Sequence, residues 1–217
     1  MDLYVDSAKA SEIDRLLTTG LFAGITCNPG ILEKDGVALN ELPTLFKTIR
    51  AHGKTLDVFF QAWGATSADL LQSSQAILDI DSSIIVKIPA TPSGLPAAQT
   101  LITSGVQVLL TAAYDASQAV LGVAMGAHSI APYFGRMNDN NIDALREVAT
   151  MQNVIVQNNS DLKIIAASLR SPRDIVNLAD AGVQGFTAAP TVWDRVFNNE
   201  LAVQAAADFE LNITQIN

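Results

Sequence analysis

Short apolar runs rich in β-branched residues recur along the chain, and the segments between them carry apolar residues at helical spacing. The runs cover residues 3–5, 22–25, 56–60, 84–88, 106–110, 129–131, 163–167 and 183–186. Nearly continuous apolar runs of this length are typical of strands buried on both faces of a parallel sheet. The pattern therefore predicts eight strands separated by helices.

The intervening segments also carry signals for helix starts. Ile13, Leu16 and Leu17 show the spacing of one apolar helix face. Residues that commonly cap a helix precede three later segments, where we expect Ser67, Asp139 and Ser171 to act as N-caps. Pro172 follows Ser171 at the first helical position, which proline favours.

Eight strands alternating with helices in a chain of 217 residues predict one (β/α)8 TIM barrel over residues 1–217. An open doubly wound sheet is the alternative, but it normally carries a glycine-rich phosphate turn after the first strand, and residues 6–9 (DSAK) lack one. No linker divides the chain. Residues 198–217 predict an additional C-terminal helix outside the closed ring, which could pack on a neighbouring subunit.

Composition narrows the possible partners. Hydrophobic residues make up 49% and charged residues 16% of the chain, which is ample material for a continuous core and excludes general disorder. The 13 Lys and Arg residues against 22 Asp and Glu residues give a net charge of −9, so we expect no nucleic acid partner. A small anionic substrate requires a few arginines to converge locally.

Cysteine and histidine are scarce. The single Cys27 cannot close an intramolecular disulfide, and His52 and His128 are too few for a histidine-rich metal site. We expect no secretory signal, because the chain starts without a basic region and a long apolar stretch. Residues 105–127 are the most apolar, but Asp115 interrupts them, so they predict a strand and a helix rather than a membrane span. These features predict a cytoplasmic protein with no membrane partner.

Every predicted strand ends in a side chain that can form hydrogen bonds. These residues are Asp6, Thr26, Gln61, Lys87, Thr111, Tyr133, Ser168 and Thr187. In a barrel, the C-terminal strand ends face the mouth where active sites lie. Because strands often pass into polar loops, part of this pattern needs no functional explanation. That argument does not explain Lys87.

Lys87 interrupts the otherwise apolar run of residues 84–88. An ammonium group removed from water loses solvation, and the neutral, nucleophilic amine then becomes accessible near neutral pH. Schiff-base catalysis requires such an amine. The alternative is a lysine that reaches solvent or pairs with a carboxylate such as Asp6. The other polar strand ends favour catalysis.

Five segments together resemble the small class I aldolases, a family that comprises fructose-6-phosphate aldolase and the short transaldolases. They are residues 3–6 (LYVD), 24–29 (GITCNP), 86–89 (VKIP), 131–136 (APYFGR) and 166–173 (AASLRSPR). The segments extend over almost the whole chain, and their combination in this order is highly specific. The resemblance implies a barrel enzyme that forms an imine on Lys87 with a ketone such as dihydroxyacetone or the ketose itself.

The resemblance also implies roles for the other polar residues. Asp6 would contact hydroxyls near the bond that breaks, and Asn28, together with Thr26, would bind the donor. A proton-shuttling water would be held by Gln61, Thr111 and Tyr133. The substrate phosphate would be bound by Arg136, Ser168 and Arg170. A protonated imine accepts the electron pair of the breaking bond, so this chemistry needs neither a metal nor a cofactor.

Gln61 and Tyr133 distinguish two branches of the family. Transaldolases resemble one another in carrying glutamate and phenylalanine at these two positions. The glutamine and tyrosine of this chain favour an aldolase that splits fructose 6-phosphate into dihydroxyacetone and glyceraldehyde 3-phosphate. The alternative is a transaldolase of the pentose phosphate pathway, which passes the dihydroxyacetone unit to another sugar phosphate.

Three further expectations remain open. Cys27 departs from the resemblance, in which threonine precedes Asn28; it is either a small packed residue or a thiol sensitive to oxidation near the mouth. A catalytically idle barrel that binds or assembles is a third hypothesis, disfavoured because buried charges cost stability. The resemblance also implies a ring-shaped homo-oligomer, a pentamer or decamer, with the C-terminal helix on a neighbour.

Overall fold

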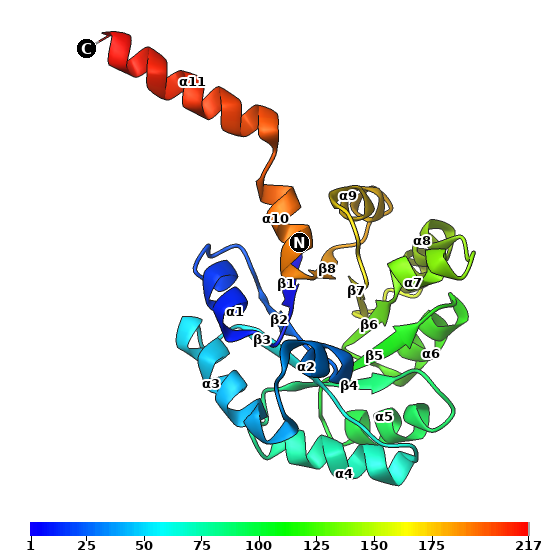
Figure 1. Ribbon diagram of the computed structural model, residues 1–217. Helices are drawn as coiled ribbons and strands as arrows, with labels where there is room; N and C mark the ends of the chain where they lie inside the picture. Colours follow the sequence, from blue (N-terminus) through cyan, green and yellow to red (C-terminus); the bar gives the residue numbers. More distant parts are fainter. Residues whose placement is uncertain (217) are drawn as a thin grey trace.

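Eight parallel strands form a closed barrel in the computed structural model, which describes residues 1–216 (Figure 1). The strands pair in chain order, and β8 closes the ring on β1 through the pairs from Asp2 with Gly185 to Val5 with Ala188. Their bounds are β1 Asp2–Asp6, β2 Gly24–Thr26, β3 Asp57–Gln61, β4 Ile85–Pro89, β5 Val108–Ala113, β6 Ser129–Pro132, β7 Lys163–Ala166 and β8 Gly185–Ala188. The predicted (β/α)8 barrel is confirmed, and the closure excludes the open sheet.

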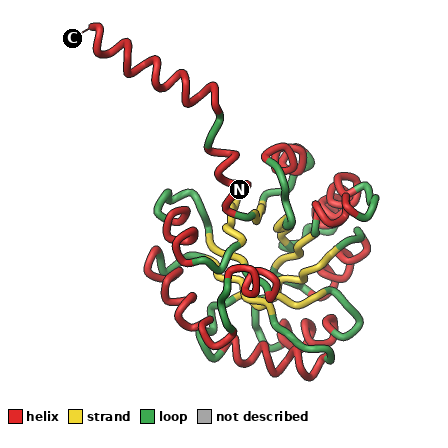
Figure 2. The backbone as a smooth tube through the Cα atoms, in the orientation of Figure 1, coloured by secondary structure: helices red, strands yellow, loops and turns green. Residues whose placement is uncertain are grey.

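Helices surround the strands in the ring shown in Figure 2. Their bounds are α1 Ala10–Leu17, α2 Pro29–Asp35, α3 Leu42–His52, α4 Ser67–Leu78, α5 Gly94–Thr103, α6 Ser117–Met125, α7 Phe134–Asp139, α8 Ala144–Gln157, α9 Pro172–Asp180, α10 Pro190–Phe197 and α11 Glu200–Ile216, with a short 3-10 helix, η1 Leu39–Glu41, before α3. Extra helices follow β2, β6 and β8, where two helices replace the single helix of a regular unit.

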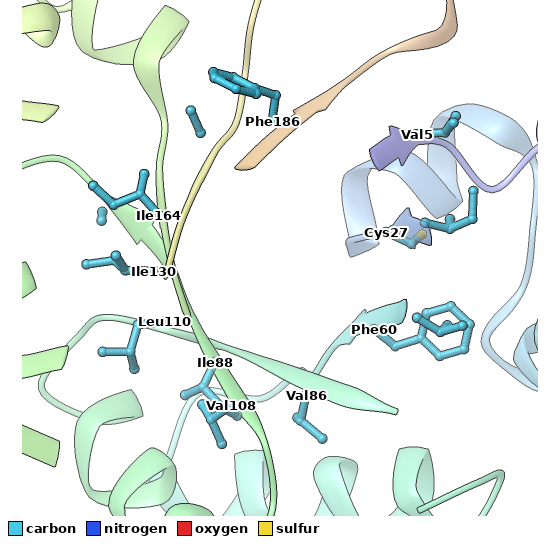
Figure 3. Close-up of a cluster of buried hydrophobic side chains, with 14 of the residues drawn as sticks. Val5, Cys27, Phe60, Val86, Ile88, Val108, Leu110, Ile130, Ile164 and Phe186 are labelled. Carbon is cyan, nitrogen blue, oxygen red and sulfur yellow. The ribbon is translucent and has the colours of Figure 1, made fainter. Parts of the chain in front are cut away.

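One apolar layer lies between the strands and the helices. Alternate strand residues point outward into it, because side chains on a strand alternate between its two faces. Figure 3 shows part of this layer, including Phe60, Val86 and Val108, all of which are buried. Helix residues such as Ile13 and Ile49 pack against it from outside. This layer holds the ring of helices on the barrel.

A second, smaller apolar cluster fills the inside of the barrel. We call its strand residues the apolar floor: Tyr4, Phe59, Ile85, Leu109, Ala131 and Ile165. Two positions further along β1, β3, β4 and β5, and directly after β6, the side chains are polar and point to the same side as the floor. With Thr26 and Thr187 they form what we call the polar mouth: Asp6, Thr26, Gln61, Lys87, Thr111, Tyr133 and Thr187.

The C-terminal helix α11 projects away from the barrel (Figure 1). Several of its apolar side chains are solvent-exposed, among them Leu201 at 82% and Phe209 at 66% of their maximal accessible surface. No helix within residues 1–216 is both long and apolar enough to cross a membrane.

Candidate active site

A cavity of about 280 Å³ opens at the C-terminal end of the barrel. Six of the residues predicted from the sequence line it: Asp6, Asn28, Lys87, Tyr133, Arg136 and Ser168. The helix α2, which crosses the front of the barrel in Figure 1, adds Gly30, Ile31 and Lys34 as one wall. Side chains that are up to 162 residues apart in the sequence, from Asp6 to Ser168, therefore share one cavity.

Local hydrogen bonds fix both ends of α2 over the cavity. At its start, Asn28 is the N-cap, and its side-chain oxygen accepts a hydrogen bond of 3.1 Å from the amide of Ile31. At its end, the carboxylate of Asp35 accepts hydrogen bonds from the Ser7 hydroxyl at 2.9 Å and the Ala8 amide at 2.8 Å. Because the cap uses the side-chain oxygen of Asn28, its NH2 group is left to donate into the cavity.

Lys87 lies on β4 in register with Gln61 on β3, and only 4% of its surface is exposed. This burial excludes a lysine that extends into bulk solvent. No ion pair joins it to a carboxylate of any described residue, so its amine is not held in a salt bridge. A nearly buried amine that borders a cavity without a carboxylate partner can react with a carbonyl group that enters the cavity.

Asp6 is the carboxylate residue that lines the cavity together with Lys87. Its Oδ1 accepts a hydrogen bond of 2.6 Å from the Thr26 hydroxyl, which lies 2.6 Å from the hydroxyl of Thr187. Burial raises the pKa of Asp6 above its ordinary value, although the charge of Lys87 and the Thr26 hydrogen bond act in the opposite direction. A carboxyl group with a raised pKa is suited to exchange protons and hydrogen bonds with substrate hydroxyls.

Tyr133 lines the same cavity and lies directly after β6. Its hydroxyl lies 3.0 Å from Thr111 Oγ1, and its ring packs edge-to-face against Tyr114 at 5.8 Å between centroids. Tyr114, in the loop after β5, was not among the predicted site residues. Nothing in its local sequence signals a role, because the contact with Tyr133 depends on how two loops meet.

Gln61 completes the polar side chains next to Lys87, but it does not line the cavity itself. Its Oε1 atom is buried and lacks a hydrogen-bond partner in the described part of the chain. Leaving a buried acceptor unpaired costs about 1–3 kcal/mol. Such an atom is available to accept a hydrogen bond from a water or a substrate group.

The far wall of the cavity carries Arg136 and Ser168. Ser168 adopts a left-handed backbone conformation with φ of 59°, and its carbonyl accepts a hydrogen bond of 3.1 Å from the amide of Gly135. A Cβ atom on Gly135 would lie 2.2 Å from that carbonyl oxygen, so only glycine permits this approach. The close contact brings Ser168 next to α7, which carries Arg136.

A family model decides the relationship of the chain to known proteins. The model described as Transaldolase/Fructose-6-phosphate aldolase matches residues 3–216, nearly the whole chain. The chain belongs to this family. Its members are aldolases and transaldolases, so the match supports the activity class expected from the resemblance.

Three solved structures with similar folds share little sequence with this chain. The thiamine phosphate pyrophosphorylase from Pyrococcus furiosus has a TM-score of 0.62 at 14% identity, over 87% of this chain and 85% of that one. A mandelate oxidase mutant with a monooxide FMN adduct has a TM-score of 0.61 at 12% identity, and a flavocytochrome b2 mutant has 0.60 at 9%. Both cover 87% of this chain, but the matches span only 64% and 56% of those chains. At these identities the likeness shows the barrel fold alone.

Four predicted site residues of this family member lie outside the cavity lining. Thr26, Gln61 and Thr111 sit behind it, in contact with or in register with residues that do line it. Arg170 differs, because its guanidinium contacts the carboxylate of Asp139 and the side chain is 57% exposed. The structure therefore brings Arg136, and not Arg170, to the cavity.

Cys27 lies in the apolar layer between strands and helices, with 1% of its surface exposed. Burial raises the pKa of its thiol to about 12, so the thiolate that reacts with oxidants is scarce near neutral pH. This environment supports the packing interpretation of Cys27 over the reactive one.

The two histidines lie away from the cavity lining. His52 pairs with Asp14 at 2.8 Å on the outside, and His128 follows α6 and precedes β6, at the opposite end of the barrel from the polar mouth. Among residues 1–216, no group of three or more His, Cys, Asp and Glu side chains is arranged to hold a metal ion.

Proposed function

We propose that the chain is a Schiff-base aldolase that splits fructose 6-phosphate into dihydroxyacetone and glyceraldehyde 3-phosphate. One observation carries the proposal: the nearly buried Lys87, without a carboxylate partner in the described chain, borders a cavity that Asp6, Tyr133 and Arg136 share. Family membership supports the reaction class, since it narrows the activity to aldol cleavage or transfer.

The first step forms the imine. The neutral amine of Lys87 adds to the C2 carbonyl of the ketose to give a carbinolamine, which takes up one proton on its hydroxyl group and loses water to give a protonated imine. Asp6 and the NH2 group of Asn28 border the same cavity, so they can hold the hydroxyl groups next to C2 while the bond forms. The positive imine then attracts the electron pair of the adjacent carbon–carbon bond.

The second step breaks the C3–C4 bond. Its electron pair moves toward the imine to form an enamine on Lys87, and the C4 hydroxyl loses its proton to become the aldehyde of glyceraldehyde 3-phosphate. We assign the proton to a water held by Tyr133, Thr111 and Gln61, whose buried Oε1 has no partner among the described residues. The enamine then takes a proton at C3, and water hydrolyses the imine to release dihydroxyacetone and the free amine.

Arg136 and Ser168 supply the groups for the phosphate of the substrate. Both line the cavity, and a guanidinium offers a planar set of donors that matches phosphate oxygens. Two basic side chains thus serve separate tasks in an acidic protein, Lys87 for covalent chemistry and Arg136 for the anion. The reaction as proposed uses no metal and no cofactor.

Transaldolase activity is the second candidate, because the same enamine can attack an acceptor aldehyde instead of taking a proton. The Tyr133 hydroxyl favours the aldolase, since it lines the cavity and offers a proton path to the enamine. A phenylalanine at this position would have no such group.

Product analysis tests this proposal. Fructose 6-phosphate is the substrate, and we expect equal amounts of dihydroxyacetone and glyceraldehyde 3-phosphate. A parallel reaction supplies sedoheptulose 7-phosphate with glyceraldehyde 3-phosphate as acceptor. Rapid group transfer with little free dihydroxyacetone would overturn the aldolase assignment in favour of the transaldolase.

We also propose that the protein acts as a cytoplasmic homo-oligomer, a pentamer or decamer, in which α11 packs on a neighbouring copy. The exposed apolar side chains of α11, such as Leu201 and Phe209, support this packing, because burial of such side chains stabilises an interface. Light scattering should give a mass several times that of one chain. Truncation before Glu200 should reduce the number of copies in the assembly. A monomeric full-length chain would contradict the proposal.

A further inference from the structure

Three neighbours hold the ring of Tyr133 in place. Thr111 contacts its hydroxyl, Tyr114 meets it edge-to-face, and the guanidinium carbon of Arg136 lies 5.0 Å from the ring centroid over its face. Tyr133 is the N-cap of α7, and Arg136 follows three residues later in the first turn of that helix. Arg136 therefore touches the proposed proton-transfer group directly.

The guanidinium nitrogen atoms of Arg136 have no hydrogen bond or ion pair with another described residue, although the side chain lines the cavity next to Ser168. Arg50 offers a contrast on α3. Its guanidinium carbon also lies over an aromatic ring, 4.9 Å from the centroid of Phe46, but its nitrogens donate to the carbonyl oxygens of Lys54 and Leu56. Only Arg136 of these two can keep its face on the ring while its donors bind an anion.

We propose that Arg136 is a positioning residue for Tyr133, and that an oxyanion bound to its guanidinium speeds proton transfer even when the anion is not part of the substrate. The proposal rests on the proposed aldolase function and adds a second task to the phosphate ligand. A guanidinium whose nitrogen atoms have no hydrogen-bond partner among the described residues is free to change rotamer, whereas an anion held by Arg136 and Ser168 fixes it. The fixed guanidinium in turn keeps the Tyr133 ring against Thr111.

In this proposal, the free energy of anion binding to Arg136 is used to orient Tyr133 for proton transfer. Displacements of about 1 Å in a catalytic group can cost as much as 10²-fold in rate. Interactions with a remote, non-reacting phosphate can therefore raise kcat, and not only lower KM, when they align the reacting groups. A phosphate ligand without this coupling would change binding of phosphorylated substrates alone.

The test uses the unphosphorylated reaction of dihydroxyacetone with glyceraldehyde, measured with and without phosphite, with sodium chloride as the ionic-strength control. We expect phosphite to raise kcat of the full-length wild-type protein by roughly three- to tenfold in a saturable way. The activation should vanish in Arg136→Met and return in part in Arg136→Lys, which keeps the charge. Arg50→Met is the matched control and should keep the full activation, because Arg50 stacks on a ring away from the cavity.

A second readout separates positioning from simple phosphate binding. With fructose 6-phosphate, Arg136→Met should lower kcat as well as raise KM, whereas loss of a binding contact that is equal in ground state and transition state raises KM alone. No effect of phosphite, or inhibition only, in a protein that cleaves fructose 6-phosphate would overturn the positioning role and leave the aldolase function standing. A protein that neither cleaves fructose 6-phosphate nor forms an imine would overturn both.

Discussion

The inside of the barrel has two layers with opposite character, although the same strands build both. Each of four strands contributes one residue to the apolar floor and, two positions later, one to the polar mouth: Tyr4 and Asp6, Phe59 and Gln61, Ile85 and Lys87, Leu109 and Thr111. The floor is closely packed, as the edge-to-face contact of Tyr4 and Phe59 at 5.3 Å shows. The mouth borders the cavity instead.

The apolar floor stabilises the barrel, whereas the polar mouth carries the groups for chemistry. Floor residues are buried among apolar neighbours, which stabilises the closed ring. Mouth residues include a buried amine without an ion pair among the described residues and a buried Gln61 oxygen without a partner there. Groups of this kind cost stability and persist in proteins mainly at functional sites. Paired substitutions in the two layers should therefore separate stability from turnover.

The largest contrast is expected within β4. Lys87→Met should reduce turnover of fructose 6-phosphate by about 10⁴-fold or more, the scale seen when a nucleophile is removed, with the free energy of unfolding unchanged or raised. Ile85→Ala should lower the free energy of unfolding by about 2–5 kcal/mol because Ile85 is buried in the floor. Steady-state kinetics and urea denaturation give the two values. Raised stability in Lys87→Met together with no turnover in the wild-type protein would instead favour the idle barrel.

The same substitution, tyrosine to phenylalanine, can be made once in the mouth and once in the floor. Tyr133→Phe should lower aldol cleavage by about 10²–10⁴-fold, the usual range for a proton-transfer group, and leave the fold intact. Tyr4→Phe removes a 3.0 Å hydrogen bond to Asp57 in the floor, so it should cost about 1–3 kcal/mol of stability with little change in kcat. Kinetics and thermal unfolding of both variants check this. Unchanged turnover in Tyr133→Phe would remove Tyr133 from the mechanism.

Two arginines near the mouth give a smaller contrast. Arg136→Met should lower kcat/KM for fructose 6-phosphate by roughly 10–100-fold, the value of one or two charge-assisted hydrogen bonds. Arg170→Met should change it by less than about threefold, because the guanidinium of Arg170 contacts Asp139 on the exposed surface. Equal losses in the two variants would show that Arg170 reaches the substrate phosphate during turnover.

The smallest effect concerns pH and the carboxyl group of Asp6. Burial raises its pKa in the folded protein, so the stability it contributes is present below the unfolded-state pKa of about 3.9 and is lost as the pH rises through the folded-state pKa. Asp6→Asn cannot ionise. Its advantage over the wild type in free energy of unfolding should therefore grow as the pH rises above about 4, by about 1.4 kcal/mol per unit of raised pKa.

Urea denaturation across that pH range measures this difference, and Asp69→Asn provides a control of opposite sign. Hydrogen bonds from Thr66 lower the pKa of Asp69, so its stabilising contribution is present at neutral pH and lost as the pH falls. A stability difference between Asp6→Asn and the wild type that does not change with pH would contradict a raised pKa at Asp6.

The sequence was a good guide to features that follow from strand periodicity. The closed barrel could be predicted because eight apolar runs alternate with helical segments, and the polar mouth because each run ends in a polar residue. Helix starts were less exact: Ser171 is the N-cap of α9, but α4 is capped by Thr66 instead of Ser67, and α8 by Asp143 instead of Asp139. Capping depends on the local backbone, and neighbouring residues of similar type compete for the position.

Features that depend on how loops meet could not be predicted from the sequence. Tyr114 contacts Tyr133 across two different βα loops, and α2 lies over the cavity because Asp35 binds the loop after β1. The same holds for Arg170, which faces Asp139 from the next βα unit rather than the cavity. Each contact joins residues that are distant in sequence, and no periodic pattern encodes such a contact.

The most direct test of the account is borohydride trapping of the imine on Lys87. The protein is incubated with fructose 6-phosphate or dihydroxyacetone, reduced with borohydride, digested and analysed by mass spectrometry, with Lys87→Met as the control. We expect a stable adduct on the peptide that contains Lys87 and none in the variant. An active wild-type protein without an adduct on Lys87, or with one on another lysine, would contradict it.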